Sequence, residues 1–163
     1  MSGNNRTDAA SRIIKASPET IYKAFLDREA VTIWRPPKGM QCYVFEFDPQ
    51  QGGKFRMSFS YISQQHDVEG KTSAHEDVFH GVFKELVPNR LITEVVQFES
   101  DDPAYANEMT VTTTLEPVGE DTKVTSICSN VPLGIKLEDH QQGISSTLDN
   151  LAAYAEPIAH ISH

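Results

Sequence analysis

Long hydrophobic runs are missing from this sequence. No stretch of about 18 consecutive apolar residues occurs, which is the least that a membrane-spanning helix requires. The first thirty residues also lack the uninterrupted apolar segment of a secretory signal, because every window is broken by polar or charged residues: Asn4, Asn5, Arg6, Asp8, Arg12 and Lys15. We therefore expect neither an integral membrane protein nor export by the secretory route.

Cysteine and positive charge are also scarce. The chain has 2 cysteines, Cys42 and Cys128, without CxxC spacing, and each lies in an apolar strand-like pattern. Buried thiols are expected there, with a reactive or bridged thiol as the alternative. Because 14 Lys and Arg stand against 23 Asp and Glu, the formal net charge is -9, which repels phosphate backbones and anionic membranes. These features predict a cytoplasmic protein that does not bind nucleic acid.

The remaining composition describes one folded unit. Of the 163 residues, 39% are hydrophobic and 23% charged, and 9 Gly with 9 Pro are too few for a collagen-like or low-complexity chain. A chain of this length has room for one domain. We predict a single domain over residues 8–157, with flexible termini at 1–7 and 158–163.

The N-terminal part predicts a strand followed by two short helices. Residues 11–16 have a strand-like pattern. Ser17 is then a candidate N-cap, and Pro18 suits the first position of a helix. A second short helix includes Trp34 and ends at the two prolines of residues 36–37.

The middle of the chain alternates polar and apolar residues as strands do. The alternation is clearest over residues 54–61, where the apolar members fall on one side. Short turns join the predicted strands and indicate an antiparallel meander, over residues 40–48, 54–61, 78–86, 91–98, 109–115 and 123–129. The polar segment 63–77 is expected to be a long loop or an extended hairpin tip.

Apolar residues recur every three or four positions from Leu137 to Ala155, which predicts a long amphipathic C-terminal helix. Elements in this order form an α+β chain whose sheet buries its apolar face against that helix. We predict a curved antiparallel seven-stranded sheet wrapped around the C-terminal helix, with two short helices after the first strand. A cavity is expected where sheet and helix diverge.

Several segments resemble a known superfamily. They are residues 16–25 (ASPETIYKAF), Trp34, residues 52–57 (GGKFRM), residues 81–91 (GVFKELVPNRL) and residues 147–154 (TLDNLAAY). In this order and spacing they resemble the START-like (SRPBCC) superfamily. Within it they are most similar to the branch named after the C-terminal domain of the activator of the heat-shock-protein-90 ATPase. The likeness runs from about Ser11 to Glu156.

The resemblance implies a helix-grip (Bet v 1-like) fold with a deep hydrophobic pocket between the last helix and the sheet. Relatives include lipid carriers, hormone receptors and aromatic polyketide cyclases, so the fold alone does not define the chemistry. Members of this branch often carry a Gly-Trp pair in the last helix, whereas here Gly143 is followed by Ile144. The smaller side chain either enlarges the pocket or exchanges one core residue for another.

Candidate ligand contacts follow from the strand and helix patterns. Trp34 is expected either to border the pocket, with its Nε1–H bonding a ligand, or to anchor the short helices. Residues of one parity in each strand are expected to face the last helix, most of them as core and some, with the methionines favoured, as pocket wall: Phe55, Met57, Phe59, Phe83, Val95, Met109, Val111 and Ile127. On the last helix, Ile144 and Leu148 are the candidates.

Histidines and catalytic motifs give no positive sign of chemistry. His66, His75 and His80 lie near acidic residues but lack HExxH spacing, so no metal site is predicted. His140 lies on the apolar stripe of the last helix near the expected pocket entrance, either as a hydrogen-bonded boundary residue or as a general base. The sequence has no Gly-x-Ser-x-Gly elbow and no GxGxxG pattern, so we predict no catalytic residue and no cofactor.

A charged side chain inside the cavity would be a sign of function, because ionisable groups with strongly shifted pKa values gather at functional sites. The solvated outer face of the sheet is nevertheless the expected position of the charged strand residues Glu46, Glu85, Glu94 and Arg56.

Binding of a small hydrophobic molecule, such as a lipid, an aromatic compound or a polyketide, is the leading functional hypothesis. A cyclase or hydrolase using the same cavity is the alternative: a buried, hydrogen-bonded ionisable group facing the cavity would support it, and an entirely apolar cavity would remove it. By analogy with the branch's name, a chaperone partner and a role in the stress response form a third hypothesis. An exposed edge strand at residues 11–16 leaves a homodimer open.

Overall fold

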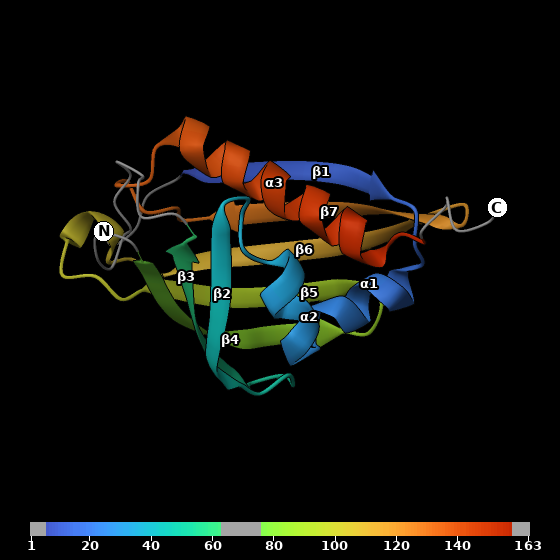
Figure 1. The fold of residues 1–163 in the computed structure, drawn as a ribbon, viewed down its shortest axis with the longest axis horizontal. Coiled ribbons are helices and arrows are strands. Elements are labelled where there is room, and N and C mark those ends of the chain that lie inside the picture. The colour runs from blue at the N-terminus through green and yellow to red at the C-terminus, as the bar shows by residue number, and fades with distance from the viewer. Residues whose placement is uncertain (1–5, 63–75, 158–163) are drawn as a thin grey trace.

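The structure is a computed structural model that describes residues 6–62 and 76–157 (Figure 1). The expectations for residues 1–5, 63–75 and 158–163, including those for His66 and His75, lie outside the described residues. The elements are β1 (Thr7–Ile14), α1 (Pro18–Phe25), α2 (Arg28–Trp34), β2 (Met40–Phe47), β3 (Lys54–Tyr61), β4 (Glu76–Val87), β5 (Leu91–Phe98), the short 3₁₀ helix η1 (Pro103–Tyr105), β6 (Met109–Val118), β7 (Asp121–Ser129) and α3 (Leu137–Ala155).

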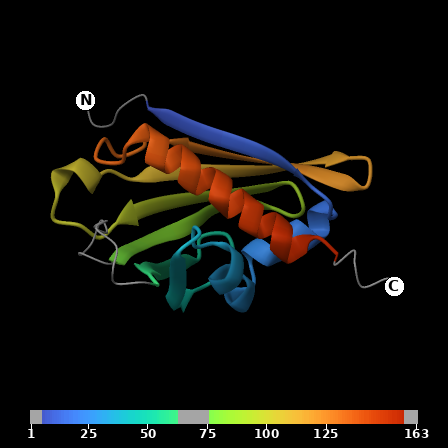
Figure 2. The same cartoon turned by 45° about the horizontal axis from the view of Figure 1, so that its top comes forward.

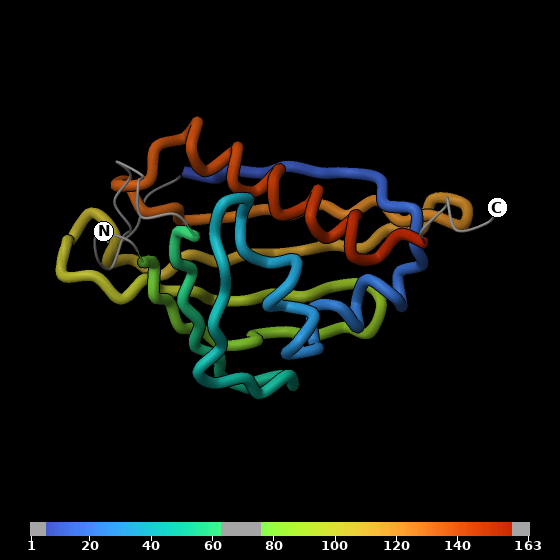
Figure 3. Tube along the Cα trace, in the orientation of Figure 1, coloured from blue at the N-terminus to red at the C-terminus, as the bar shows by residue number. Residues whose placement is uncertain are grey.

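The strands form one antiparallel sheet in the order β1-β7-β6-β5-β4-β3-β2. Helix α3 runs diagonally across one face of this sheet, and α1 and α2 lie beside it on the same face (Figures 1 and 2). The tube in Figure 3 shows how β2 and β3 turn steeply away from the direction of β5 and β6, so that the sheet curves around the helices. The predicted α+β helix-grip fold is confirmed.

Local sequence explains both short helices. The Ser17 side chain accepts a hydrogen bond of 3.2 Å from the Thr20 backbone N–H, and Pro18 begins α1. The Asp27 carboxylate caps α2 by accepting bonds of 2.9 and 3.2 Å from the N–H groups of Glu29 and Ala30. The end of α2 falls just before residues 36–37, as the two prolines predict.

The first strand differs from its prediction. It covers Thr7–Ile14 instead of residues 11–16, because β1 pairs with β7 from Thr7 opposite Ser129 to Ile14 opposite Thr122. The length of this edge strand is therefore set by its neighbour. Pairing of this edge between two copies of the chain stays an open alternative.

The face of the sheet that meets α3 is defined by the register. Residues opposite one another on neighbouring strands share a face, and one such row runs from Glu94 through Val111 and Cys128 to Asp8. This row faces inward: Glu94, Cys128 and Asp8 are 1%, 4% and 2% exposed. Two acidic side chains thus point toward the helical layer.

The predicted parity is wrong for Val95 and Ile127. Val96 is 4% exposed and packs in the core, whereas the neighbouring Val95 is only half-buried on the other face. Ile127 is likewise half-buried, next to the buried Cys128. Adjacent apolar residues left either parity open in the sequence, and cross-strand pairing decides between them.

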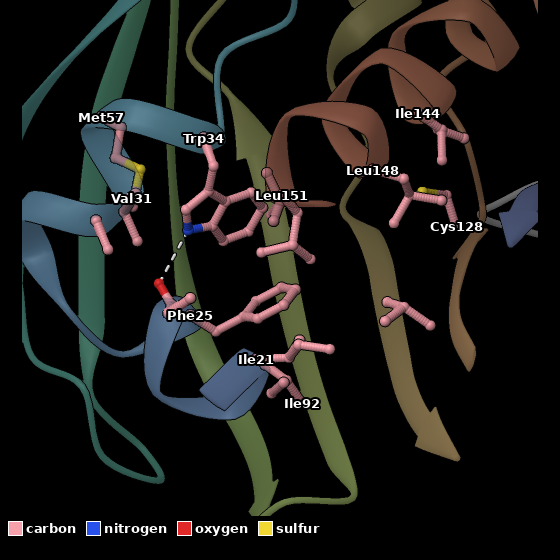
Figure 4. Packing of buried hydrophobic residues seen from close by; sticks show 14 of the residues in the cluster. Ile21, Phe25, Val31, Trp34, Met57, Ile92, Cys128, Ile144, Leu148 and Leu151 are labelled. Carbon is pink, nitrogen blue, oxygen red and sulfur yellow. Dashed lines mark hydrogen bonds between the residues drawn. The ribbon is translucent and has the colours of Figure 1, made fainter. Parts of the chain in front are cut away.

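Beneath the helices lies a continuous apolar core. Trp34, Leu151 and Ile92 are among its members, and the side chains of α1, α2 and α3 converge there on the sheet (Figure 4). The predicted inward residues Phe55, Met57 and Phe83 are at most 1% exposed and belong to this core.

Candidate functional site

A cavity of about 910 Å³ lies between α3 and the inner face of the sheet. Strands β2 to β7 contribute to its wall, together with the end of α1, the end of α2, the segment that follows α2, and α3 from Asp139 to Asp149. The cavity is the space that the sheet leaves where it curves away from the helix.

Seven of the predicted ligand contacts line this cavity: Trp34, Phe59, Met109, Val111, His140, Ile144 and Leu148. Four others do not. Phe55, Met57 and Phe83 are packed in the core, and Val95 points to the opposite face of the sheet. Contact of the seven with a ligand stays a prediction.

Trp34 takes part in the cavity wall, but its polar atom is already bonded. The indole Nε1 donates a hydrogen bond of 2.9 Å to the carbonyl oxygen of Ala24 (Figure 4). The ring is 2% exposed and lies 4.6 Å, centroid to centroid, from Phe25. This geometry favours the anchoring role over hydrogen bonding to a ligand.

A buried ion pair lies on the cavity wall, contrary to the expectation that Glu94 is solvated. Arg35 donates two hydrogen bonds to the Glu94 carboxylate, Nη1 to Oε2 at 2.8 Å and Nη2 to Oε1 at 3.0 Å. The side chains are 12% and 2% exposed, and both residues line the cavity. Burial opposes the charge of Arg35, but the attraction and hydrogen bonds of Glu94 outweigh it and raise the pKa of the guanidinium.

Arg35 is not among the residues that the sequence predicted for this site. The residue follows the last turn of α2 and serves as its C-cap, a position where a basic side chain is commonly explained by the helix dipole alone. Its partner lies 59 residues away on β5, so local pattern could not join them. A sequence signal for this ion pair did exist: Glu94 is an acidic residue within the largely apolar strand β5.

Three hydrogen bonds hold the segment after α2 against α3. Thr147 Oγ1 donates to the carbonyl oxygen of Arg35 at 3.2 Å, and Asn150 Nδ2 donates to that of Pro36 at 2.8 Å. The Lys38 backbone N–H donates to Ser146 Oγ at 3.0 Å. The backbone that carries Arg35 is thereby fixed relative to the helix that closes the cavity.

His140 belongs to a second charged cluster, at the β1 side of α3. Its Nδ1 lies 2.7 Å from Asp8 Oδ2, and Arg6 donates to the same carboxylate from Nε at 3.2 Å and Nη2 at 2.8 Å. The Asp8 side chain is fully buried. Burial alone would raise the pKa of Asp8, but the bonds and charges of Arg6 and His140 outweigh it and lower the pKa below its ordinary value.

The other charged strand residues lie where they were expected. Glu46 and Glu85 are exposed. On the outer face, Arg56 donates to Glu99 from Nε at 2.8 Å and Nη2 at 2.9 Å, and His80 Nδ1 lies 3.0 Å from the same carboxylate. These contacts, with the Arg56 bonds the largest cause, lower the pKa of Glu99 to about 2.

Neither thiol has the character of a nucleophile. Both cysteines are free, and burial raises the pKa of Cys42 to about 11 and that of Cys128 to about 12. The thiolate is the reactive form, so these groups are inert at neutral pH. Cys128 is buried as predicted, whereas Cys42 is only partly buried.

Within residues 6–62 and 76–157, no group of three or more His, Cys, Asp or Glu side chains is arranged to hold a metal ion. In the same part of the chain, no helix has the length and apolar content that crossing a bilayer demands.

Most of the chain matches a known protein family. The sequence pattern of the family described as "Activator of Hsp90 ATPase homolog 1-like protein" matches residues 15–156. Among curated proteins, none matches the chain.

Solved structures share the fold. Protein CV1439 from Chromobacterium violaceum is 32% identical, with a TM-score of 0.81 over 93% of this chain and 97% of the other. Mll3558 from Rhizobium loti is 23% identical, with a TM-score of 0.70 over 94% and 99% of the two chains. The AHSA1-like protein from Aeromonas hydrophila is 15% identical, with a TM-score of 0.70 over 97% and 96%. The last two likenesses concern the fold alone.

Proposed function

The chain belongs to the family of activator of Hsp90 ATPase homolog 1-like proteins, within the START-like superfamily, and from this premise we propose that it binds a small, mainly apolar molecule in the cavity between α3 and the sheet. The observation that carries the proposal is the cavity itself, with a volume of about 910 Å³. Cavities of this size accept small organic ligands.

The wall of the cavity has the chemistry that such a ligand needs. Its apolar part includes aromatic, thioether and aliphatic side chains from both layers: Phe59, Phe79, Phe98, Met109, Val96, Val111, Ile144 and Leu148. Covering about 300 Å² of apolar ligand surface contributes roughly 7 kcal/mol at about 25 cal/mol per Å². After the costs of association, an affinity of about micromolar remains.

The test is thermal unfolding and calorimetric titration with apolar compounds of three shapes: dodecanol, 2-acetonaphthone and flavone. At least one is expected to raise the melting temperature, and to raise it further with each increase in ligand concentration, because a ligand that binds only the folded state stabilises it by an amount that grows with the logarithm of its concentration. The variant Ile144→Trp, with a larger side chain in the cavity wall, is the matched control and should lose the effect. If none of the three shifts unfolding or releases heat, the proposal fails.

A hydrolase or cyclase is the second candidate, favoured by one observation. The cavity is not entirely apolar, and the Asp8 carboxylate lies 2.7 Å from His140 Nδ1, an arrangement that orients a histidine for general-base work. Hydrolysis of 2-naphthyl acetate by the intact protein and by His140→Gln tests it. Equal rates for the two proteins would dismiss this candidate.

The chaperone role rests on the family description alone. Stimulation of a bacterial heat-shock-protein-90 ATPase by the purified chain is the measurement, and its absence would remove the role. A cytoplasmic location and a part in the stress response belong to the same proposal.

A further inference from the structure

The guanidinium of Arg35 has hydrogen-bonding capacity left over at the cavity wall. An arginine side chain carries five N–H donors, and Glu94 accepts a bond from each of the two terminal nitrogens. Among residues 6–62 and 76–157, no other group accepts a hydrogen bond from this guanidinium. Arg35 lines the cavity, and its side chain is 12% exposed. The remaining donors are therefore offered to whatever occupies the cavity.

The guanidinium is also held in place. Its central carbon lies 5.6 Å from the ring centroid of Phe55 and 5.9 Å from that of Phe79, within the range of cation–π attraction. The Arg35 backbone donates to Val31 and accepts from Thr147 on α3. A donor fixed from both its backbone and its head group loses little freedom when a ligand accepts its hydrogen bond.

Stability alone is a poor explanation for this pair. Taking two charges out of water costs several kcal/mol per ion, and apolar residues of similar volume in the same place are often as stable or more so. The outer face also carries a bidentate pair, in which Arg56 binds Glu99 through Nε and Nη2, and its side chains, 41% and 29% exposed, avoid most of that cost. An ion pair buried at the cavity wall is better explained by recognition.

Glu94 decides which polar group fits. Its carboxylate balances the charge of Arg35, so a ligand anion would lose its own hydration and approach a site of no net charge. Asp77, 5% exposed, lines the same cavity and adds a further acidic side chain. A cation would be attracted by Glu94 and Asp77 but repelled by the guanidinium, and it has no lone pair with which to accept the free N–H groups. A neutral oxygen, as in a ketone, ester or amide, accepts the free N–H groups without either penalty.

We infer that Arg35 donates hydrogen bonds to a neutral carbonyl-type oxygen on an otherwise apolar ligand, and that Glu94 sets the preference for a neutral group over a carboxylate. This inference rests on the proposed function and narrows the class of ligand.

The test uses naphthalenes that share one apolar body. These are 2-acetonaphthone, which carries a neutral ketone, 2-ethylnaphthalene, its hydrocarbon counterpart, and 2-naphthoate, an anion. Calorimetric titration of the intact chain is expected to give an affinity for the ketone at least about tenfold above those for the hydrocarbon and the anion, as one hydrogen bond to a charged donor allows. In Glu94→Gln the carboxylate is gone, and 2-naphthoate should become the preferred ligand by about tenfold.

The double variant Arg35→Met with Glu94→Met removes the pair without leaving an isolated charge, so it keeps the test valid if Glu94→Gln does not fold. It should bind the ketone and the hydrocarbon equally. The control Arg56→Met with Glu99→Gln removes the outer pair and should keep the wild-type preference. If wild type binds the hydrocarbon as tightly as the ketone, the inference is overturned while the proposed function stands. If none of the three naphthalenes binds, the inference is overturned, and the proposed function falls with it only when dodecanol and flavone also fail to bind.

Discussion

The indole nitrogen of Trp34 donates a hydrogen bond of 2.9 Å to the carbonyl oxygen of Ala24, ten residues earlier. Ala24 lies in the last turn of α1, a region whose carbonyl groups lack helical partners, and Trp34 ends α2. One bond therefore joins two short helices that would be marginal on their own. It also explains why Trp34 contributes to the cavity wall while its N–H is directed to Ala24.

Replacing this donor should weaken the fold more than the site. Trp34→Phe is expected to lower the free energy of unfolding by about 2 kcal/mol, since a buried carbonyl loses its partner and a small void forms. Urea denaturation followed by circular dichroism measures it. Tyr154→Phe, at a side chain that is 41% exposed, is the control and should change little. A Trp34→Phe protein as stable as wild type would contradict the anchoring role.

Helix α3 contains a glycine, Gly143, at a position where a side chain has room. A Cβ added at Gly143 would meet no atom within 4 Å, and glycine inside a helix costs about 0.5–1 kcal/mol relative to alanine. Gly143→Ala should therefore raise the free energy of unfolding by that amount.

The neighbouring Ile144 lines the cavity, and Ile144→Trp should lower the affinity for 2-acetonaphthone by at least about tenfold. Wild-type affinity in Ile144→Trp would show that the ligand binds elsewhere.

The buried carboxylate of Asp8 should be needed for stability at neutral pH. Asp8→Asn is expected to cost about 2 kcal/mol, because Arg6 and His140 lose a charged acceptor. The folded pKa of Asp8 is lowered from 3.8, so its contribution is complete above that value and is lost as the pH falls through the folded pKa. The gap between wild type and variant should thus shrink in acid. Asp149→Asn, at an exposed ion pair, is the control.

Protonation of Glu99 should lower the stability of the protein in acid. Its pKa falls from 4.5 to about 2, so the stabilisation is present above pH 4.5 and is lost as the pH drops toward 2. In Glu99→Gln the stability curve should be flatter between these values, as measured by urea denaturation at successive pH. Arg56→Met removes the same contact from the other side and should flatten the curve too. An unchanged slope in both variants would refute the pairing.

Thiol labelling tests the interior around the cavity. With pKa values of about 11 and 12, Cys42 and Cys128 carry under about 1% thiolate at pH 8. Iodoacetamide followed by mass spectrometry should therefore leave both unmodified in the native protein and label both in denaturant. Rapid labelling of native Cys42 would argue against the burial described.

Strand β5 was predicted correctly in its bounds but not in the face of the sheet that each residue takes. Its bounds, Leu91–Phe98, agree with the predicted strand, because a turn and a change in polarity mark both ends. Its facing was predicted wrongly, because Val95 and Val96 are equally apolar. Pairing of Glu94 with Val111 resolves the ambiguity and turns an acidic residue inward. Glu94, which lines the cavity, was therefore predicted to lie on the solvated face of the sheet.

Composition, hydrophobic period and capping residues determined the order of elements and the fold class, because each of these signals is local in the chain. Only the tertiary structure decided that Arg35 meets Glu94, that Asp8 meets His140 and that Trp34 bonds Ala24. The first two contacts join residues 59 and 132 positions apart, and a side chain's partner at such separations depends on strand register and on how the helices pack across the sheet.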